Sequence, residues 1–214
     1  MRIAINGMGR IGWLLFRRIW EAGKFEIAAV NDIIPPDNMA YLLQYDSVYG
    51  TFAEKITYEN DQLHIGGKSV RVYNQGNPSR LPWKEGGIDV VLECSGQFLD
   101  RNSAEKHLQA GAQKVLLSTT GKADIALKIF GFNQNGNIAD LDILSPGGCM
   151  TNCSIHVLYV LHSIGIESAM INVLHSYTSR QALVDSAHNQ YRRGRAAAES
   201  IIPVDIDLCN SLDR

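Results

Sequence analysis

The chain has 214 residues, of which 45% are hydrophobic, and its 20 basic and 22 acidic side chains give a formal net charge of −2. This length allows one large domain or two small ones, and the near-neutral charge gives no electrostatic reason to expect binding to nucleic acid or an anionic membrane. No apolar run reaches about 18 residues and Met1 leads directly into a strand-like segment, so neither a membrane span nor a signal peptide is predicted.

Short β-branched runs alternate with helical patterns in the N-terminal part. Residues 2–6 predict a strand, residues 11–20 a helix ended by Gly23, and residues 25–31 the next strand. Further strands are predicted at 69–73, 88–92, 114–117, 128–132 and 141–144, and further helices at about 38–45 and 103–110, the latter closed by Gly111. Strands separated by helices indicate an α/β fold with a Rossmann-type, doubly wound and largely parallel sheet.

The C-terminal part of the chain has a different pattern. Thr151 and Asn152 are typical helix-start residues, and an apolar stripe follows them. A strand is predicted at 170–175, and a basic stretch follows at 191–195. We therefore expect a domain boundary near residue 148.

A glycine motif follows the first predicted strand. Residues 7–12 read Gly-Met-Gly-Arg-Ile-Gly, the pattern of a dinucleotide-binding loop. Gly7 allows a tight turn, Gly9 lets a pyrophosphate approach the backbone, and Gly12 lets the helix pack against the strand. Asp32, about 20 residues further on, would accept hydrogen bonds from a ribose and repel a 2′-phosphate, which predicts NAD rather than NADP. The alternative is a glycine-rich turn with a solvated aspartate.

Cys149 is predicted to lie at the start of a helix, directly after Gly147 and Gly148. The unpaired amides and the dipole at that end favour a thiolate, and the glycines would expose it to a substrate. The alternative is an ordinary buried cysteine. Cys153, one turn further on, is expected to face the core. A reducing, cytoplasmic setting is predicted because no paired framework of a small secreted domain is visible among Cys94, Cys149, Cys153 and Cys209.

His175 closes the predicted strand at 170–175. A histidine where a strand leaves a sheet can meet a residue at a helix start, which would give a Cys–His pair. Taken alone, a structural histidine is the simpler interpretation. A zinc site on Cys149, Cys153 and His156 lacks a fourth ligand nearby, so no metal is predicted.

Several short motifs occur in the order found in one enzyme family. They are Ile5-Asn6-Gly7, Arg10-Ile11-Gly12, Val30-Asn31-Asp32, Tyr45-Asp46-Ser47, Leu81-Pro82-Trp83, Glu93-Cys94-Ser95-Gly96, Thr151-Asn152-Cys153, His175-Ser176-Tyr177-Thr178 and the stretch from Arg192 to Pro203. Over essentially the whole chain, these residues resemble the glyceraldehyde-3-phosphate dehydrogenase family and its sister, erythrose-4-phosphate dehydrogenase.

The resemblance implies an NAD-binding Rossmann domain at residues 1–148 and the start of an α+β catalytic domain at residues 149–214, with the C-terminal remainder absent. It implies NAD-dependent oxidation of a phosphorylated sugar aldehyde through a cysteine thiohemiacetal and thioester, in a cytoplasmic, glycolytic homotetramer. Two alternatives are a non-phosphorylating enzyme like erythrose-4-phosphate dehydrogenase, and a catalytically poor NAD-binding or interaction protein.

The resemblance also implies roles for individual residues. Cys149 would be the nucleophile, and His175 the base toward its thiol and a donor to the developing oxyanion. Cofactor contacts are implied for Gly7, Gly9, Arg10, Ile11, Gly12, Asp32, Ser95 and Thr119. Contacts to substrate phosphate or inorganic phosphate are implied for Thr178 and for Arg193 or Arg195.

Some positions depart from the family pattern. Gly148 and Met150 stand where hydroxyl side chains are usual, and Ile206 stands where a hydroxyl is typical. Asp205 and Asp207 would repel an anion nearby. These departures predict a weakened phosphate site beside an intact NAD fold.

Overall fold

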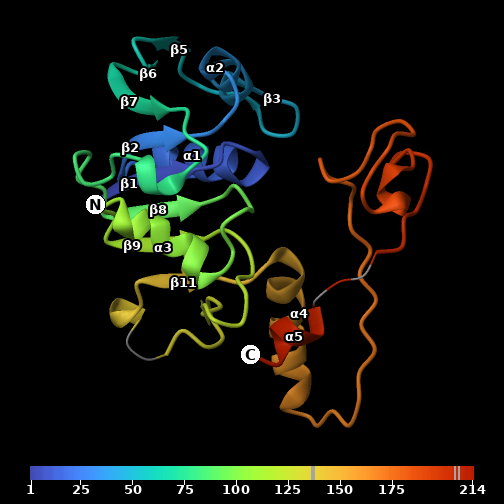
Figure 1. Cartoon of the computed structure of the whole chain (residues 1–214). Coiled ribbons are helices and arrows are strands. Elements are labelled where there is room, and N and C mark those ends of the chain that lie inside the picture. The colour runs from blue at the N-terminus through green and yellow to red at the C-terminus, as the bar shows by residue number, and fades with distance from the viewer. Residues whose placement is uncertain (136–137, 205, 207) are drawn as a thin grey trace. The chain divides into compact units, whose positions relative to one another are not determined.

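The structure is a computed structural model that describes residues 1–135, 138–204, 206 and 208–214 (Figure 1). The chain divides into two compact units, Met1–Cys149 and Met150–Arg214. Asp205 and Asp207, the expected source of negative charge near a phosphate, lie outside the described residues.

The first unit is built on one sheet, which has nine strands among the described residues. From one edge to the other, their order is β10-β11-β9-β8-β1-β2-β7-β6-β5. The pairs from β10 to β7 are parallel, whereas β7, β6 and β5 pair antiparallel. The bounds are β1 Arg2–Asn6, β2 Glu26–Asn31, β5 Ile56–Glu59, β6 Gln62–Ile65, β7 Lys68–Tyr73, β8 Val90–Glu93, β9 Lys114–Leu117, β10 Ala126–Leu127 and β11 Ile143–Ser145.

The chain runs from β1 to β2 and β7 on one side, and then returns to β8 on the other side of β1. The strand order therefore reverses between β1 and β8, as in a doubly wound sheet. The helices of this unit are α1 Arg10–Ala22, α2 Pro36–Gln44 and α3 Arg101–Gln109, and a two-stranded hairpin follows α2 with β3 Tyr45–Asp46 and β4 Gly50–Thr51. The predicted α/β, Rossmann-type fold is confirmed.

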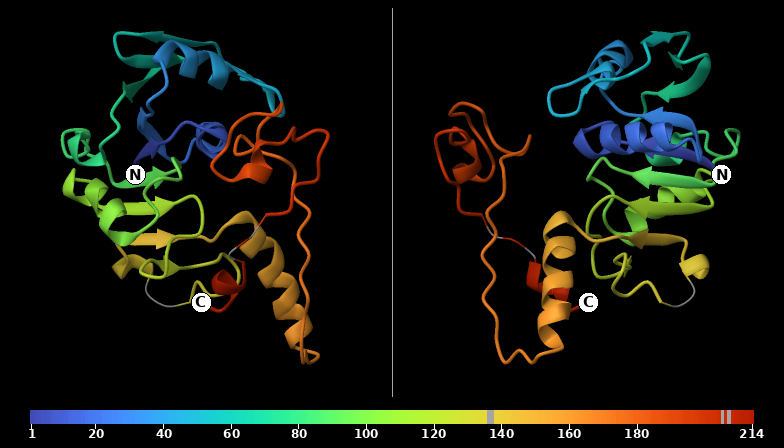
Figure 2. Two further views of the ribbon diagram at one scale, coloured as in Figure 1. Left: turned by 45° about the vertical axis from the view of Figure 1, so that its right-hand side comes forward. Right: turned by 180° about the vertical axis from the view of Figure 1, so that it is seen from behind.

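Apolar side chains cover both faces of this sheet because successive strand residues point to opposite sides. On one face Ile3 and Ile5 pack in the same cluster as Phe16 of α1. On the other face Val115 packs with Ala104 of α3. The views in Figures 1 and 2 show α1 and α3 on opposite sides of the sheet. Because helices cover both faces of the sheet, the ends of its strands are the part left open for a site.

The strand predicted at 128–132 is wrong. The strand there, β10, covers only Ala126–Leu127, and the chain then turns. Asn133 explains the turn, because its Oδ1 accepts the amide of Ile129 at 2.7 Å and its Nδ2 donates to Leu127 O at 3.0 Å. An asparagine side chain thus takes the backbone groups that a longer ladder would need.

The second unit, described by itself, carries little regular structure. Its described elements are the helix α4 Cys149–His162, whose first residue belongs to the first unit, a 3₁₀ turn Tyr191–Gly194, and α5 Leu208–Leu212. The strand predicted at 170–175 is wrong, because those residues pair with no other strand among the described residues. A strand requires a hydrogen-bonded neighbour, whatever its side-chain pattern. Among the described residues, no helix is both long and apolar enough to cross a membrane.

Candidate functional site

Five loops at one edge of the first unit carry the predicted cofactor and thiol residues. The strands β1, β2, β8, β9 and β11 run parallel, so their carboxyl ends meet at the same edge. The loops that follow them carry Gly7, Asp32, Ser95, Thr119 and Cys149 respectively. The fold of one unit thus brings these five positions to one edge.

The glycine turn fits a dinucleotide. Gly7 has a φ of +96°, and a Cβ there would lie 2.4 Å from the amide nitrogen of Ser95, so no larger residue fits. A Cβ on Gly12 would lie 2.1 Å from Gly7 O, which forces a glycine where α1 packs against the turn. By contrast, a Cβ on Gly9 would meet no atom within 4 Å. Gly9 also caps α1 without a side chain, so that helix end presents its amides to a pyrophosphate.

Asp32 lies in the loop after β2, and its carboxylate also holds the glycine turn in place. Its Oδ2 accepts the amide of Met8 at 2.5 Å, and its Oδ1 accepts the amides of Ile33 at 2.6 Å and Ile34 at 3.2 Å. A carboxylate oxygen can accept a second hydrogen bond, so Oδ2 retains capacity for a ribose hydroxyl. Asp32 can therefore accept from a ribose while it braces the turn.

Arg10 links the start of α1 to the β3–β4 hairpin. Its Nη1 donates to Asp46 Oδ2 at 2.5 Å, and the Asp46 side chain is 2% exposed whereas that of Arg10 is 50% exposed. Burial alone would raise the pKa of Asp46, but hydrogen bonds from the amides of Tyr49 and Val48 and from Arg10 outweigh it and hold this pKa below its usual range. Arg10 is thus held in place by a buried carboxylate. Ile11, beside it, is largely exposed.

Cys149 is exposed and is positioned by a cluster of hydroxyl groups. Ser145, fully buried at the end of β11, donates to Thr119 O at 2.7 Å and accepts the amide of Gly147 at 3.1 Å. The amide of Gly148 donates to Thr120 Oγ1 at 2.8 Å. These contacts bind the loop after β9 to the loop before α4, so the thiol starts α4 at the same edge as the glycine turn.

The other cysteines differ from Cys149. Burial raises the pKa of Cys94 to about 12, which keeps it a thiol. Cys153 is exposed, so the expectation that it faces the core is wrong. The buried residues of α4 are Thr151 and Ile155, and Cys153 lies two residues from each, about 200° around the helix.

The remaining predicted residues lie in the second unit. His175 is exposed, and its Nδ1 contacts Ser176 O at 2.6 Å, which requires the proton on Nδ1 and leaves Nε2 as an acceptor in the neutral ring. Since Cys149 belongs to the first unit and His175 to the second, their pairing stays a prediction.

A compact loop holds Thr178, Arg193 and Arg195. A backbone hydrogen bond joins Ala182 to Arg193 at 2.9 Å, and a Cβ on Gly194 would lie 2.3 Å from Ser186 O. Arg195 pairs with Asp185 at 2.6 Å. In contrast, Arg193 Nε is buried without a hydrogen-bond partner among the described residues. The two arginines thus differ, because the guanidinium of Arg195 already pairs with a carboxylate, whereas Arg193 has a buried guanidinium nitrogen without a partner among the described residues.

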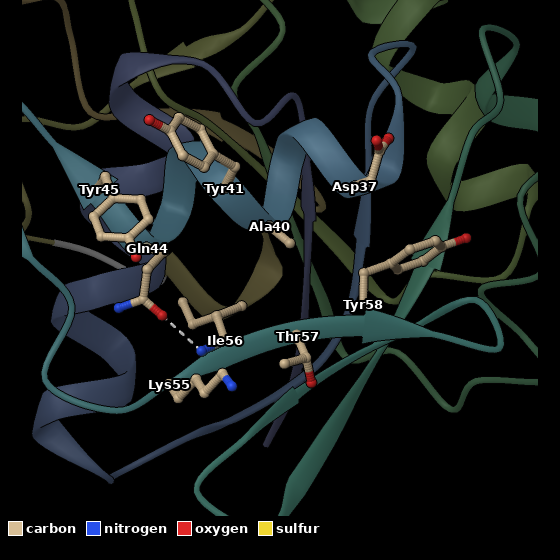
Figure 3. A pocket seen from close by; sticks show the side chains of 9 residues that line it. All are labelled: Asp37, Ala40, Tyr41, Gln44, Tyr45, Lys55, Ile56, Thr57 and Tyr58. Atoms are coloured by element: carbon tan, nitrogen blue, oxygen red, sulfur yellow. Dashed lines mark hydrogen bonds between the residues drawn. The ribbon is translucent and has the colours of Figure 1, made fainter.

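A hollow of about 340 Å³ lies elsewhere, between α2 and β5 (Figure 3). Its lining includes Tyr41, Tyr45 and Tyr58 but none of the predicted site residues. Gln44 at its base is already engaged, because its Oε1 accepts the amide of Ile56 at 2.7 Å. This hollow is separate from the sheet edge that carries Gly7, Asp32, Ser95, Thr119 and Cys149, which we call the cofactor edge.

Sequence reasoning missed several residues that build the site. Ser145 and Thr120 position Cys149, and a serine that ends a strand just before Pro-Gly-Gly was the available signal. Glu93 and His107 are fully buried, and Glu93 contacts both His107 and the amide of Ser95. An acid that ends the apolar run Val-Val-Leu was a signal for a buried carboxylate.

Comparison with known families agrees with this geometry. Residues 1–101 match the family described as "Glyceraldehyde 3-phosphate dehydrogenase, NAD binding domain". Residues 148–212 match "Glyceraldehyde 3-phosphate dehydrogenase, C-terminal domain". The two matches are the two domains of one family of NAD-dependent dehydrogenases, in the expected order, and the first names the cofactor that the glycine turn and Asp32 fit. The chain therefore belongs to the glyceraldehyde-3-phosphate dehydrogenase family, and its cofactor is NAD.

Proposed function

We propose that this protein oxidises a phosphorylated sugar aldehyde with NAD, using Cys149 as the nucleophile. The observation that carries the proposal is the position of Cys149, which is exposed and starts α4 at the sheet edge that also carries the glycine turn. A helix start supplies amide groups that stabilise a thiolate and, later, an oxyanion. Thiol and cofactor turn thus share one edge of one unit.

The chemistry assigns a role to each residue. His175 accepts the thiol proton and returns it to the aldehyde oxygen as Cys149 Sγ bonds to the aldehyde carbon, which gives a thiohemiacetal. NAD, when bound, accepts the hydride that this carbon loses. His175 takes the hydroxyl proton as the hydride leaves, so the carbon becomes a thioester on Cys149. Attack by the acyl acceptor then breaks the S–C bond and releases the acid, and the proton held on His175 restores the thiol. The glycine turn and Asp32 hold the cofactor, and Ser95 and Thr119 lie beside it on the same edge.

Thr178 and Arg193 bind the phosphate group of the substrate in this proposal. Arg193 is favoured over Arg195 because Asp185 already pairs with Arg195. A planar guanidinium suits phosphate oxygens, and a threonine hydroxyl adds a neutral donor. The substrate class is therefore a small aldehyde that carries a phosphate group.

Water, rather than inorganic phosphate, is the proposed acyl acceptor. Hydroxyl groups that would hold a second phosphate are replaced at Gly148, Met150 and Ile206. At 148 the space is restricted, because a Cβ would lie 3.1 Å from Thr120 Oγ1. Losing two or three hydrogen bonds to a charged group, at roughly 1.5–3 kcal/mol each, weakens binding by orders of magnitude.

The test is NAD reduction by the purified chain with several phosphorylated and unphosphorylated aldehydes. Cys149→Ala is expected to lower turnover at least about 1000-fold, because it removes the sulfur on which the proposed thioester forms. Cys153→Ala is the matched control, since its thiol is exposed one turn along the same helix. Equal activity of Cys149→Ala and the unmodified chain would overturn the proposed nucleophile.

The acyl acceptor is tested separately, by titrating inorganic phosphate from zero to the millimolar range. Turnover is expected to change less than about twofold, because the phosphate-binding hydrogen bonds are absent. Arsenate should likewise give little acceleration. A steep rise in NADH production would instead assign phosphate as the acceptor. Met150→Thr should restore some phosphate dependence if the side chain at 150 faces that site.

A second candidate function is an NAD-binding protein with little catalysis. The observation in its favour is that the cofactor edge lies within the first unit, whereas His175 and Arg193 belong to the second. NAD binding without turnover on any aldehyde would support this candidate over the first.

We also propose a homo-oligomer. Val157, Tyr159 and Val160 are exposed along α4, with relative exposures of 58%, 61% and 65%. Several exposed apolar side chains on one helix favour an interaction surface. A monomer in analytical ultracentrifugation would contradict this.

A further inference from the structure

Three buried polar side chains form a row under the cofactor edge. Asn31, Asn6 and Glu93 are the last residues of the adjacent strands β2, β1 and β8, and the register pairs Asn6 with both of the others. All three are buried, and Glu93 is 0% exposed. The row crosses from β1 to β8, where the strand order reverses and a dinucleotide lies across a doubly wound sheet.

Hydrogen bonds from two directions converge on the carboxylate of Glu93. Its Oε2 contacts Asn6 Nδ2 at 2.5 Å and His107 Nε2 at 2.9 Å. Its Oε1 accepts the amide of Ser95 at 2.7 Å and also the Ser95 hydroxyl. None of these four contacts comes from a lysine or an arginine. Ser95 is one of the expected cofactor residues, and its backbone is the surface that Gly7 packs against.

The direction of this network is fixed at the His107 end. The Trp83 indole nitrogen, which can only donate, lies 3.0 Å from His107 Nδ1. The ring proton of His107 must therefore be on Nε2, where it donates to Glu93. His107 is buried with both ring nitrogens engaged, so the pair is a carboxylate with a neutral histidine.

The direction is fixed at the other end by the backbone of Gln75. The amide of Gln75 donates to Asn31 Oδ1 and its carbonyl accepts from Asn31 Nδ2, both at 2.9 Å, which sets the orientation of that side-chain amide. Asn31 Nδ2 then donates to Asn6 Oδ1 at 2.7 Å, so Asn6 presents Nδ2 to Glu93. Donors thus reach position 93 from both ends, and only a group with acceptors on both oxygens satisfies them.

We propose that Glu93, as a buried carboxylate, is a positioning residue for NAD. It fixes Ser95 and, through Asn6, the start of the Gly7 turn, without touching the cofactor itself. A glutamine of the same shape cannot replace it, because its amide nitrogen would face donors, whichever of the two oxygen positions it took. This inference depends on NAD binding and not on the aldehyde reaction.

The first test uses Glu93→Gln in the full chain, with NAD affinity measured by calorimetry and the folded fraction by circular dichroism. The expected result is a dissociation constant raised about tenfold or more after correction for unfolded protein. Leu63→Ala is the control, since Leu63 is fully buried on β6, away from the cofactor edge, and its loss costs stability alone. Unchanged affinity in folded Glu93→Gln, or an equal loss in Leu63→Ala, would overturn the proposal.

A rescue variant separates positioning from general destabilisation. In Trp83→Phe, His107 is free to carry its proton on Nδ1. In the double variant, His107 Nε2 can then accept a hydrogen bond from the side-chain amide that Glu93→Gln introduces. One of the two donors that face this position is thereby removed, and Asn6 Nδ2 remains. The loss caused by Glu93→Gln should therefore be smaller in the Trp83→Phe background than in the unmodified chain. An equal loss in both backgrounds would refute the role assigned to the donor directions.

The second measurement needs no variant and remains available if Glu93→Gln does not fold. Nitrogen-15 NMR of the histidine rings should show His107 protonated at Nε2 and not at Nδ1. The His107 and Trp83 ring resonances should shift on saturation with NAD, since the network supports the cofactor edge. The opposite tautomer, or ring resonances unchanged by NAD, would contradict the inference.

Discussion

The first unit holds its site residues by burial and long-range contacts, whereas the second holds its own by local turns. Asn6, Glu93 and Ser145 are buried at strand ends and bind loops that lie far apart in the sequence. In the second unit the described bonds around Thr178 and Arg193 join residues within one short loop. Ile155 and Leu208 are the buried apolar side chains described there.

This difference indicates how the function is divided. The residues proposed to bind NAD are held in place by the fold of the first unit. The residues proposed for proton transfer and phosphate binding depend on turns whose side chains are largely exposed. Binding of NAD and turnover are therefore expected to respond to different variants.

Thiol reactivity should give the largest contrast, between a partly buried and an exposed cysteine of the first unit. Burial raises the pKa of Cys94 to about 12, so at neutral pH its thiolate fraction is about a thousandfold below that of an ordinary thiol. Cys149, exposed at a helix start, should be alkylated first, followed by Cys153 and Cys209. Limiting iodoacetamide with peptide mass mapping measures the order. Labelling of Cys94 ahead of Cys149 would contradict the predicted order of reactivity.

Asp32→Asn should sharpen the comparison by damaging NAD binding alone. We expect affinity for NAD to fall roughly 10- to 100-fold, because the charge that accepts the Met8 amide and a ribose hydroxyl is lost. The preference for NAD over NADP should also shrink, since a 2′-phosphate no longer meets a carboxylate. Fluorescence titration with both cofactors measures this.

Asp37→Asn serves as the control for that variant. Asp37 lies on α2 and lines the separate hollow, so its neutralisation should leave both cofactor affinities unchanged (Figure 3). If Asp32→Asn leaves both cofactor affinities unchanged, as Asp37→Asn should, then Asp32 neither stabilises the glycine turn for binding nor accepts a hydrogen bond from the ribose.

Lowering the pH should weaken the hydrogen bond and ion pair between Arg10 and Asp46 in the first unit. We expect this effect on stability to be the smallest of the predicted effects. The pKa of Asp46 is below its usual value of 3.8 in the folded chain, so its stabilisation is complete above that value and is lost as the pH falls through the folded pKa. Asp46→Asn should cost about 1–2 kcal/mol at pH 7. The gap to the unmodified chain should narrow as the pH falls below 3.8 and through the folded pKa, as followed by urea unfolding. A gap that persists in acid would show that the charge is not the cause.

Local sequence patterns were enough to predict the elements on which the cofactor site is built. The glycine turn, the strands around it and the helix ended by Gly23 are set by backbone requirements of a few neighbouring residues. The same kind of signal was available for the missed β5–β6 hairpin. Its turn residues Asn60 and Asp61 both have positive φ, a property of tight hairpin turns.

Tertiary contacts decided what the local pattern could not. The segments at 128–132 and 170–175 have strand-like side chains, yet Asn133 ends one and the other pairs with no strand among the described residues. The network around Glu93 joins Trp83, His107 and Asn6, which are separated by 10 or more positions from it along the chain. Its donor directions are set only when strands β1, β2 and β8 lie side by side. The sequence by itself thus determined which loops are predicted to bind NAD. The assembled sheet decided how a buried carboxylate holds them, because hydrogen-bond partners distant in sequence are chosen by the fold.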